Sequence, residues 1–347
     1  MYIDTLEQLS TYLQTKQLNW SECYLPSPTE MGKYFSLRLP KFYADLINWK
    51  DPNDPLRRMV IPDPRELEAR TYELIDPIGD HTHEPVKGLI HRYPDRCLLL
   101  LTTHCTIHCR FCFRRDVIGT PLPIDVVGIE LYLSSHPEIH EIIFTGGDPA
   151  TIPVAFLENI LSRLKKIDSI DTIRFHTRSM VVDPSVVTDE WLAMLNDLSD
   201  KRIVIAFHIN HRREVTTELK SLCQKLSALR VTLLSQSVLL KGVNDNEAQL
   251  VALFKAIFAI GIKPYYLHHL DKARGTHHFR ISIEQGRKLF EKLRGRISSY
   301  LMPEYVLDLP GGDGKVPVMW LSSLGGGNYE VLNFEGNKII YHDEAAI

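Results

Sequence analysis

Apolar runs alternate with helical patterns through the middle of the chain, and this alternation limits the possible folds more than any other feature. The runs are rich in Val, Ile, Leu and Phe, and six of them cover Cys97–Thr103, Glu141–Thr145, Thr172–His176, Ile203–His208, Val231–Val238 and Pro264–His268. Between them, apolar residues repeat at helical spacing, as at Leu157, Ile160, Leu161 and Leu164. Strands and helices in regular alternation predict a parallel sheet.

Six strand–helix units are too few for a closed eight-fold barrel. We therefore predict an α/β fold with an open, partial β/α barrel over residues 96–300, and a doubly wound sheet is the competing architecture. Residues 1–95 are expected to form a mostly helical region that wraps around the barrel. Residues 301–347 are expected to add a strand at Glu304–Leu309 and a hairpin tail with turns at Gly325–Asn328 and Glu335–Asn337.

Each apolar run ends in residues that can do chemistry. These residues are His104 and Cys105, Gly146–Asp148, His176 and Arg178, His208 and Asn210, Gln236, and His268, His269 and Asp271. In β/α barrels the loops after the strand C-termini build the active site. The succession of such endings predicts a site at that edge of the sheet, although any one of them alone could be an ordinary loop residue or a helix cap.

Three cysteines follow the first run in a CxxxCxxC array, Cys105, Cys109 and Cys112. Thiolates at this spacing can bind three irons of a cubane cluster and leave the fourth iron open to an outside molecule. The alternatives are a zinc site completed by His104 or His108, a disulfide, or buried cysteines. The other cysteines are isolated and supply no second half for a paired zinc site.

The formal net charge of −3 gives no electrostatic case for binding nucleic acid or an anionic membrane. The N-terminal residues have no apolar core of signal-peptide length, and no long apolar stretch follows them. Clustered cysteines without an export signal indicate a reducing compartment. We therefore expect a cytoplasmic protein with neither nucleic acid nor a membrane as a partner.

A set of motifs allows a closer identification. In order along residues 46 to about 320 they are HRYPDR, HCTIHCRFCFRR, TGGDP, HINH, SQSVLLKGVND, YYLHHLD, HHFR and DLPGGDGK. Together they resemble the lysine 2,3-aminomutases, which are radical S-adenosylmethionine (SAM) enzymes that also use pyridoxal 5′-phosphate (PLP). The tail has no cysteine, unlike the zinc-binding extension of longer members, so the chain resembles the short form that makes (R)-β-lysine for elongation factor P.

The resemblance implies a role for each motif. The expected ligands of a 4Fe–4S cluster are Cys105, Cys109 and Cys112. The expected SAM contacts are Gly146, Gly147, Asp148, His208 and Gln236. The expected substrate contacts are Asp271 and Asp308 for the terminal ammonium of L-lysine and Arg114 for its α-carboxylate.

Lys315 is the catalytic residue that the resemblance implies, because the matching lysine of the family forms a Schiff base with PLP. Such a lysine must be neutral to attack, which burial and nearby cations favour. Taken alone, PGGDGK is more often a hairpin turn with an exposed lysine. Asp313 stands where the family usually has a glycine.

The implied activity is the interconversion of L-lysine and β-lysine through a 5′-deoxyadenosyl radical and PLP. The implied partners are L-lysine, an electron donor such as flavodoxin or ferredoxin, and the ligase system that loads elongation factor P. Three alternatives stay open. They are an aminomutase for arginine or glutamate, a radical SAM enzyme that cleaves SAM irreversibly without PLP, and a non-catalytic iron–sulfur or zinc sensor.

Overall fold

A nine-stranded sheet forms the centre of the computed structural model, which describes residues 2–23, 25, 36–68 and 70–344. Its strands are β3 Leu89–Tyr93, β4 Arg96–Thr102, β5 Glu141–Gly146, β6 Thr172–Thr177, β7 Arg202–His208, β8 Thr232–Val238, β9 Lys263–His268, β10 Glu304–Asp308 and β11 Lys315–Pro317. Strands β4 to β10 run parallel, and β3 and β11 pair antiparallel at the two edges. The six expected strands and the seventh at residue 304 are confirmed.

The strands lie in the sheet in the order in which they follow along the chain. A doubly wound sheet reverses its strand order at a switch point, which places helices on both faces. Without a reversal, successive right-handed crossovers place the helices on the same face and curl the sheet. The prediction of an open, partial barrel is therefore confirmed.

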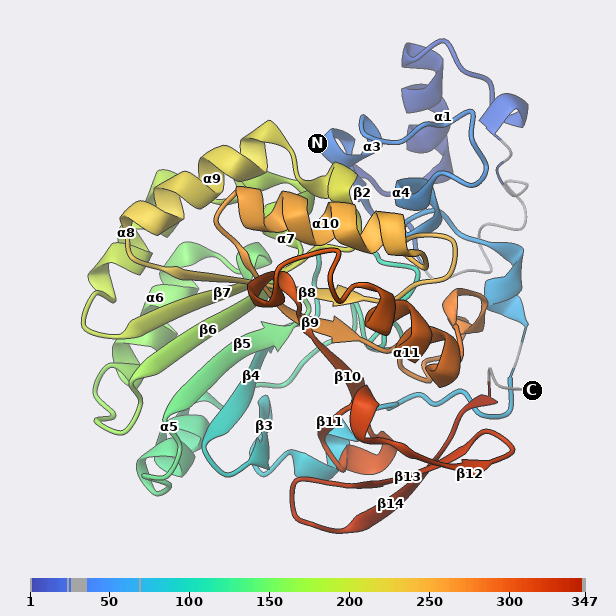
Figure 1. Ribbon diagram of the computed structural model, residues 1–347. Coiled ribbons are helices and arrows are strands. Elements are labelled where there is room, and N and C mark those ends of the chain that lie inside the picture. The colour runs from blue at the N-terminus through green and yellow to red at the C-terminus, as the bar shows by residue number, and fades with distance from the viewer. Residues whose placement is uncertain (1, 24, 26–35, 69, 345–347) are drawn as a thin grey trace.

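The helices lie along the outer side of the curled sheet (Figure 1). They are α5 Val126–Ser134, α6 Val154–Leu164, α7 Ser179–Val182, α8 Asp189–Asp197, α9 Thr217–Ala228, α10 Glu247–Ala259 and α11 Ile283–Lys292. Five of them begin after a side chain that accepts a hydrogen bond from the first turn, those of Asp125, Thr188, Thr216, Asn246 and Ser282. A cap of this kind contributes about 1 kcal/mol. The apolar face of α6, Leu157 to Leu164, is buried in the main core as its spacing predicts.

The N-terminal residues pack on the loops at the open end of the barrel. Their elements are β1 Tyr2–Ile3, α1 Leu6–Thr15, β2 Leu39–Pro40, α3 Lys41–Ala44 and α4 Pro55–Arg58. Tyr43 and Leu13 share a second core with Phe111, Leu240 and Phe279 of the barrel loops. This segment therefore covers the cysteine loop from outside.

The sheet extends past both ends of the range 96–300 predicted for the barrel. Strand β3 precedes that range, and β10 and β11 follow it. The division into three domains stays a prediction. Beyond β11, a separate sheet of β12 Ser322–Gly325, β13 Asn328–Leu332 and β14 Lys338–His342 forms two hairpins, as predicted. In the part of the chain that the structure describes, no helix is both long and apolar enough to cross a membrane.

Candidate active site

The C-terminal ends of the parallel strands open into a cavity of about 270 Å³. Every site residue predicted from the sequence lines it, namely Cys105, Cys109, Cys112, Arg114, Gly146, Gly147, Asp148, His208, Gln236, Asp271, Asp308 and Lys315. Parallel strands deliver their C-terminal loops to one edge of the sheet, so residues far apart in the sequence meet there. The structure thus brings the predicted residues together, while the role of each remains a proposal.

The three cysteines of the array lie on the loop between β4 and α5. Burial raises the pKa of Cys105 well above the ordinary thiol value, and the charges of Asp148, Cys112 and Cys109 raise it further. Burial also raises the pKa of Cys109 and of Cys112. Thiolates that repel one another in a buried site need a cationic centre to stay ionised, and the irons of a cluster supply one.

The zinc alternative finds little support in the positions of the two histidines. The Nδ1 atom of His108 lies 3.0 Å from Ser36 Oγ and 2.9 Å from Ser36 O. His104 is not among the residues that line the cavity. Within the described ranges, no group of three or more His, Cys, Asp or Glu side chains is placed to hold a single metal ion. The cysteine set therefore suits a cluster, in which each thiolate serves a different iron.

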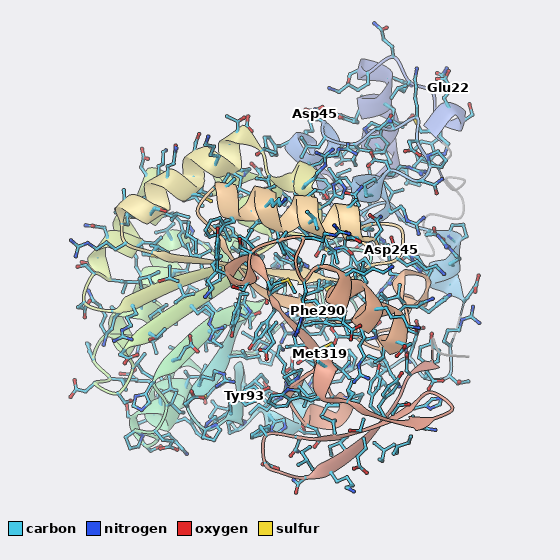
Figure 2. The ribbon with its side chains drawn as sticks, viewed as in Figure 1. Glu22, Asp45, Tyr93, Asp245, Phe290 and Met319 are labelled. Atoms are coloured by element: carbon cyan, nitrogen blue, oxygen red, sulfur yellow. The ribbon has the colours of Figure 1, made fainter. Side chains whose placement is uncertain are left out.

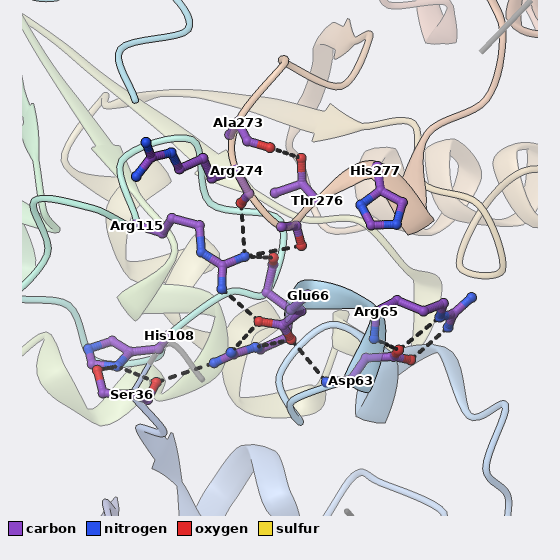
Figure 3. A network of polar contacts seen from close by, with 12 residues as sticks. Ser36, Asp63, Arg65, Glu66, His108, Arg115, Ala273, Arg274, Thr276 and His277 are labelled. Carbon is purple, nitrogen blue, oxygen red and sulfur yellow. Dashed lines mark hydrogen bonds and ion pairs between the residues drawn. The ribbon is translucent and has the colours of Figure 1, made fainter. Parts of the chain in front are cut away.

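Glu66 holds the cysteine loop from the N-terminal side (Figure 3). Its carboxylate accepts hydrogen bonds from Arg110 Nε at 2.8 Å and Nη2 at 2.5 Å, and from Arg115 Nη2 at 2.6 Å. Arg110 lies between two of the array cysteines and is fully buried. Arg115 also donates to the carbonyls of Arg274 and Gly275, each at 3.2 Å. Three distant segments of the chain are therefore joined beneath the thiols.

Gly146 and Gly147 let the end of β5 approach the chain that leads into the cysteine loop. A Cβ atom on Gly146, whose φ is +105°, would lie 2.7 Å from Thr102 O, and one on Gly147 would lie 2.2 Å from His104 O. The backbone N–H of Gly147 donates to Thr102 O at 2.6 Å, and that of Asp148 donates to His104 O at 2.7 Å. The glycines thus have a packing reason in addition to any contact with a ligand.

The carboxylate of Asp148 is fully used inside the protein. It accepts hydrogen bonds from the backbone N–H groups of Ala150 at 3.0 Å, and of Arg178 and Ser179 at 2.7 Å each. It also accepts one from Thr177 Oγ1 at 2.9 Å. Its expected contribution to SAM binding is therefore best assigned to fixing the ends of β5 and β6 rather than to a direct carboxylate contact.

His208 and Gln236 are paired in register on β7 and β8. The Nε2 atom of His208 lies 3.2 Å from Asn210 Nδ2, and its ring packs 5.5 Å from that of Phe111 in the cysteine loop. Burial, and after it the charge of Arg178, keeps the pKa of His208 well below its ordinary value. A neutral imidazole beside the cysteine loop suits hydrogen bonding to a ligand rather than charge pairing.

Lys315 lies at the opposite end of the cavity, where it opens β11. Its Nζ atom donates to Asp308 Oδ1 at 2.6 Å, and its backbone N–H donates to Tyr93 Oη at 2.7 Å. Tyr93 stands at the end of β3 (Figure 2). Although burial opposes the effect, Asp308 raises the pKa of Lys315. The lysine is therefore held as an ammonium here, contrary to the neutral form that burial and neighbouring cations were expected to favour.

Asp271 and Asp308 differ in their partners. Asp308 contacts Lys315 and lies 3.5 Å from His268 Nδ1, so its pKa falls well below the usual range despite its burial. Asp271 Oδ1 is buried and has no hydrogen-bond partner among the described residues. Burial, and then the charge of Asp308, raises the pKa of Asp271. Lys315 is thus bonded to Asp308, whereas Lys315, Arg280 and Arg114 act on Asp271 only as nearby charges, and its Oδ1 has no bonded cation among the described residues.

Positive charge gathers on the wall that β6 contributes. Burial lowers the pKa of His176 far below its ordinary value, and Arg174, Lys315, His268 and Arg114 lower it further. The Nε2 atom of His176 is buried without a partner among the described residues. Arg174, Lys315 and Arg114 are each already paired with a carboxylate. The unused Nε2 atom of His176 is therefore what this wall offers to a ligand such as the phosphate of PLP.

Asp80 was not predicted from the sequence. It lies next to Gly79, in the segment that leads into β3. Its carboxylate accepts hydrogen bonds from Arg114 Nη2 at 2.5 Å and from Arg92 Nη2 at 3.1 Å. Gly79 beside it packs against the Gly311 and Gly312 backbone that leads to Lys315. The HRYPDR motif contains Arg92 and Tyr93, but the sequence assigned neither of them a role. No pattern in the sequence indicated Asp80.

Removing the charge of Asp80 should disturb the guanidinium of Arg114. We expect Asp80→Asn to raise the KM for substrate about tenfold with a smaller change in kcat, because a charge-assisted hydrogen bond contributes about 1.5–3 kcal/mol. Asp80→Glu should restore part of the loss. Glu130→Gln is the matched control, because Glu130 pairs with Arg163 on the surface away from the cavity. An unchanged KM in Asp80→Asn would show that Arg114 needs no such support.

The Radical SAM superfamily model matches residues 99–254. An L-lysine 2,3-aminomutase of Clostridium subterminale is 34% identical over 350 residues, which cover 98% of this chain and 82% of that protein. An L-lysine 2,3-aminomutase of Escherichia coli (strain K12) is 36% identical over 289 residues, or 82% of this chain and 84% of that protein. A glutamate 2,3-aminomutase of Clostridioides difficile (strain 630) is 34% identical over 352 residues, or 99% and 81%.

Proposed function

Because this chain belongs to the lysine 2,3-aminomutase family of the radical SAM superfamily, we propose that it interconverts L-lysine and β-lysine. The family makes it a radical SAM aminomutase, an isomerase that depends on a 4Fe–4S cluster, SAM and PLP. The choice of substrate is the open question, since relatives of similar identity are named for lysine and for glutamate. The chemistry of the cavity supports lysine.

The observation that carries the proposal is the charge balance around Asp271 and Asp308. The ammonium of Lys315 is 2.6 Å from Asp308, whereas Asp271 has no hydrogen-bond partner on its buried Oδ1 among the described residues. A substrate with a terminal ammonium would supply the missing cation. The side chain of glutamate would add a third negative charge to the same buried space, at a cost that its own hydrogen bonds would have to offset.

When bound, the cluster and SAM supply a radical that removes a hydrogen atom from the substrate, and PLP supplies a π system through which an amino group can migrate. The cysteine loop would hold the cluster at one end of the cavity, and Lys315 would anchor PLP at the other. Arg114 would bind the α-carboxylate of lysine and so fix the substrate between them.

Linkage of Lys315 to PLP would take its ammonium away from Asp308. Both acids would then be available to the terminal ammonium of the substrate.

The test is an anaerobic assay of protein reconstituted with iron, sulfide and PLP, to which SAM, a strong reductant and an amino acid are added. Chiral chromatography separates α-lysine from β-lysine, and parallel reactions contain arginine or glutamate. We expect β-lysine to form much faster than either alternative product. A preference for glutamate would refute the substrate assignment, and SAM cleavage without any β-amino acid would refute the aminomutase proposal itself.

Neutralising either acid should weaken lysine binding selectively. We expect Asp271→Asn and Asp308→Asn to raise the KM for lysine about 10- to 100-fold, the loss that follows from one charge-assisted hydrogen bond. SAM cleavage should persist in both variants, because neither acid is an expected cluster ligand or SAM contact. Equal KM values in Asp271→Asn and the parent protein would show that the substrate ammonium lies elsewhere.

The raised pKa of Asp271 predicts a pH dependence. Below that pKa Asp271 is protonated and cannot pair with an ammonium, so kcat/KM for lysine should rise as the pH rises through it. In Asp271→Asn this rise of kcat/KM with pH, one limb of the pH profile, should disappear, whereas Glu130→Gln should retain it. A limb that survives in Asp271→Asn would belong to another group.

A role in supplying β-lysine for elongation factor P is part of the proposal, and a reduced flavodoxin or ferredoxin would supply the electron. One observation agrees with that role, which is that the described tail, up to residue 344, contains no cysteine. Transfer of labelled lysine to elongation factor P by its ligase, with and without this enzyme, is the direct test.

A further inference from the structure

We propose that the C-terminal strand β14 and Asp343 position Asp271 for substrate recognition. The inference rests on the proposed function, in which Asp271 receives the substrate ammonium. It assigns the tail a part in specificity, although no tail residue from 319 onward lines the cavity.

The contacts of the Asp271 side chain do not explain how its carboxylate keeps its position. The residue is half-buried in the cavity wall, and its buried Oδ1 has no hydrogen-bond partner among the described residues. A carboxylate without side-chain partners depends on its backbone for direction. The segment that follows, Asp271 to Ser282, has no strand and only one short helical turn, His277–Phe279. Its rigidity must therefore come from other parts of the chain.

The start of this segment is tied to β14. Arg280 Nη2 donates to the carbonyl of Asp271 at 2.7 Å, and its Nη1 lies 3.5 Å from Tyr341 Oη. Lys272 Nζ donates to the carbonyl of His342 at 2.7 Å and lies 4.7 Å from the centre of the Tyr341 ring. Tyr341 is 3% exposed, so these contacts lie in the protein interior. The Lys272 side chain is therefore bonded to the strand directly, and the backbone of Asp271 is connected to it through Arg280.

The end of the segment is tied to the next residue of the tail. Asp343 is fully buried, and its Oδ2 accepts a hydrogen bond at 2.6 Å from the backbone N–H of Ile283, the first residue of α11. The negative charge at this helix N-terminus is also favourable to the helix dipole. The backbone N–H of Asp343 in turn donates to Gly327 O at 2.7 Å, in the turn between β12 and β13.

Three consecutive tail residues, Tyr341 to Asp343, thus hold both ends of the segment that begins with Asp271. A carboxylate that is displaced from the ammonium makes a longer and weaker charge-assisted hydrogen bond with it. We therefore expect removal of these tail contacts to weaken recognition of the ammonium and to leave the radical chemistry intact.

The experiment compares L-lysine with L-norleucine, which ends in a methyl group and has no terminal ammonium. Binding is followed by the change in the visible spectrum of the PLP-loaded enzyme, and KM and kcat for lysine are measured in parallel. Lys272→Met removes the bond to His342 O while keeping most of the side-chain stem, and Asp343→Asn is the second variant. Lys338→Met is the matched control, because Lys338 lies on the same strand and pairs only with surface Glu330.

We expect Lys272→Met and Asp343→Asn to weaken lysine binding and raise its KM by about tenfold. Norleucine binding, kcat, iron content and SAM cleavage should stay at the level of Lys338→Met. Unchanged lysine binding in both variants, or an equal loss for lysine and norleucine, would overturn the proposal. If the parent enzyme does not prefer lysine to norleucine, the assignment of Asp271 fails first, and this outcome separates the two proposals.

Discussion

Lys315→Ala should abolish aminomutase activity, by on the order of a thousandfold or more, because the covalent anchor of PLP is removed. Lys315 is the only lysine among the described residues that line the cavity, so no neighbour is placed to replace it. The visible absorbance of lysine-linked PLP should disappear. Reductive cleavage of SAM should continue, because it depends on the cysteine end of the cavity.

Lys315→Arg separates the two roles of this side chain. Arginine preserves a cation beside Asp308 but cannot form a Schiff base, so it should lose PLP linkage while retaining more thermal stability than Lys315→Ala. Lys288→Ala, in an exposed part of α11, is the control and should behave as the parent protein. Full activity in Lys315→Ala would remove PLP from the account of this site, and full activity in Lys315→Arg would mean that only charge matters.

Cys109→Ala should eliminate both the cluster and SAM cleavage. A cubane held by three thiolates does not survive the loss of one of them in a cavity that offers no replacement, so iron content should fall to a small fraction of the parent value. The expected loss of activity is again on the order of a thousandfold or more. Iron and sulfide analysis, followed by measurement of 5′-deoxyadenosine, provides the readout under anaerobic conditions.

Cys223→Ala is the matched control for this experiment. Cys223 is also buried, but it is a residue of α9 in the main core and lies far from the array along the chain. It should lose some stability and keep its iron. Retention of a full cluster in Cys109→Ala would assign the ligands to other side chains, and loss of iron in Cys223→Ala would point to a general effect of cysteine removal.

The parallel strands could be predicted because each contains apolar residues that pack under the helices, as the alternating burial of β4, β6 and β8 shows. The edge strands could not, since β3 is half polar and β11 has only three residues. Both pair with the neighbouring strand along the chain, β3 with β4 and β11 with β10, so a weak apolar pattern hid them. Asp80 was missed for another reason, because its contact with Arg114 spans 34 positions without any periodic pattern.

The glycine pair illustrates a different limit. Gly146 and Gly147 were expected at the site, and they line it, but the sequence alone did not reveal that Thr102 and His104 occupy the space their side chains would need. The carboxylate of Asp148 likewise proved to be saturated, by the backbone N–H groups of Ala150, Arg178 and Ser179 and by the Thr177 hydroxyl. Residue type predicted where these groups lie, and only three-dimensional packing revealed what each one contacts.

The contact between Tyr93 and Lys315 joins residues 222 positions apart, which bears on how the holoenzyme is assembled. Closing so long a loop is slow compared with forming a local turn, and it must wait until the last strand of the sheet has been synthesised. The cysteine array, in contrast, spans only Cys105 to Cys112. During synthesis the thiols are therefore available to an iron–sulfur donor while the far wall of the cavity is still absent. The connectivity of the chain therefore allows the cluster to be loaded before the PLP end of the cavity exists.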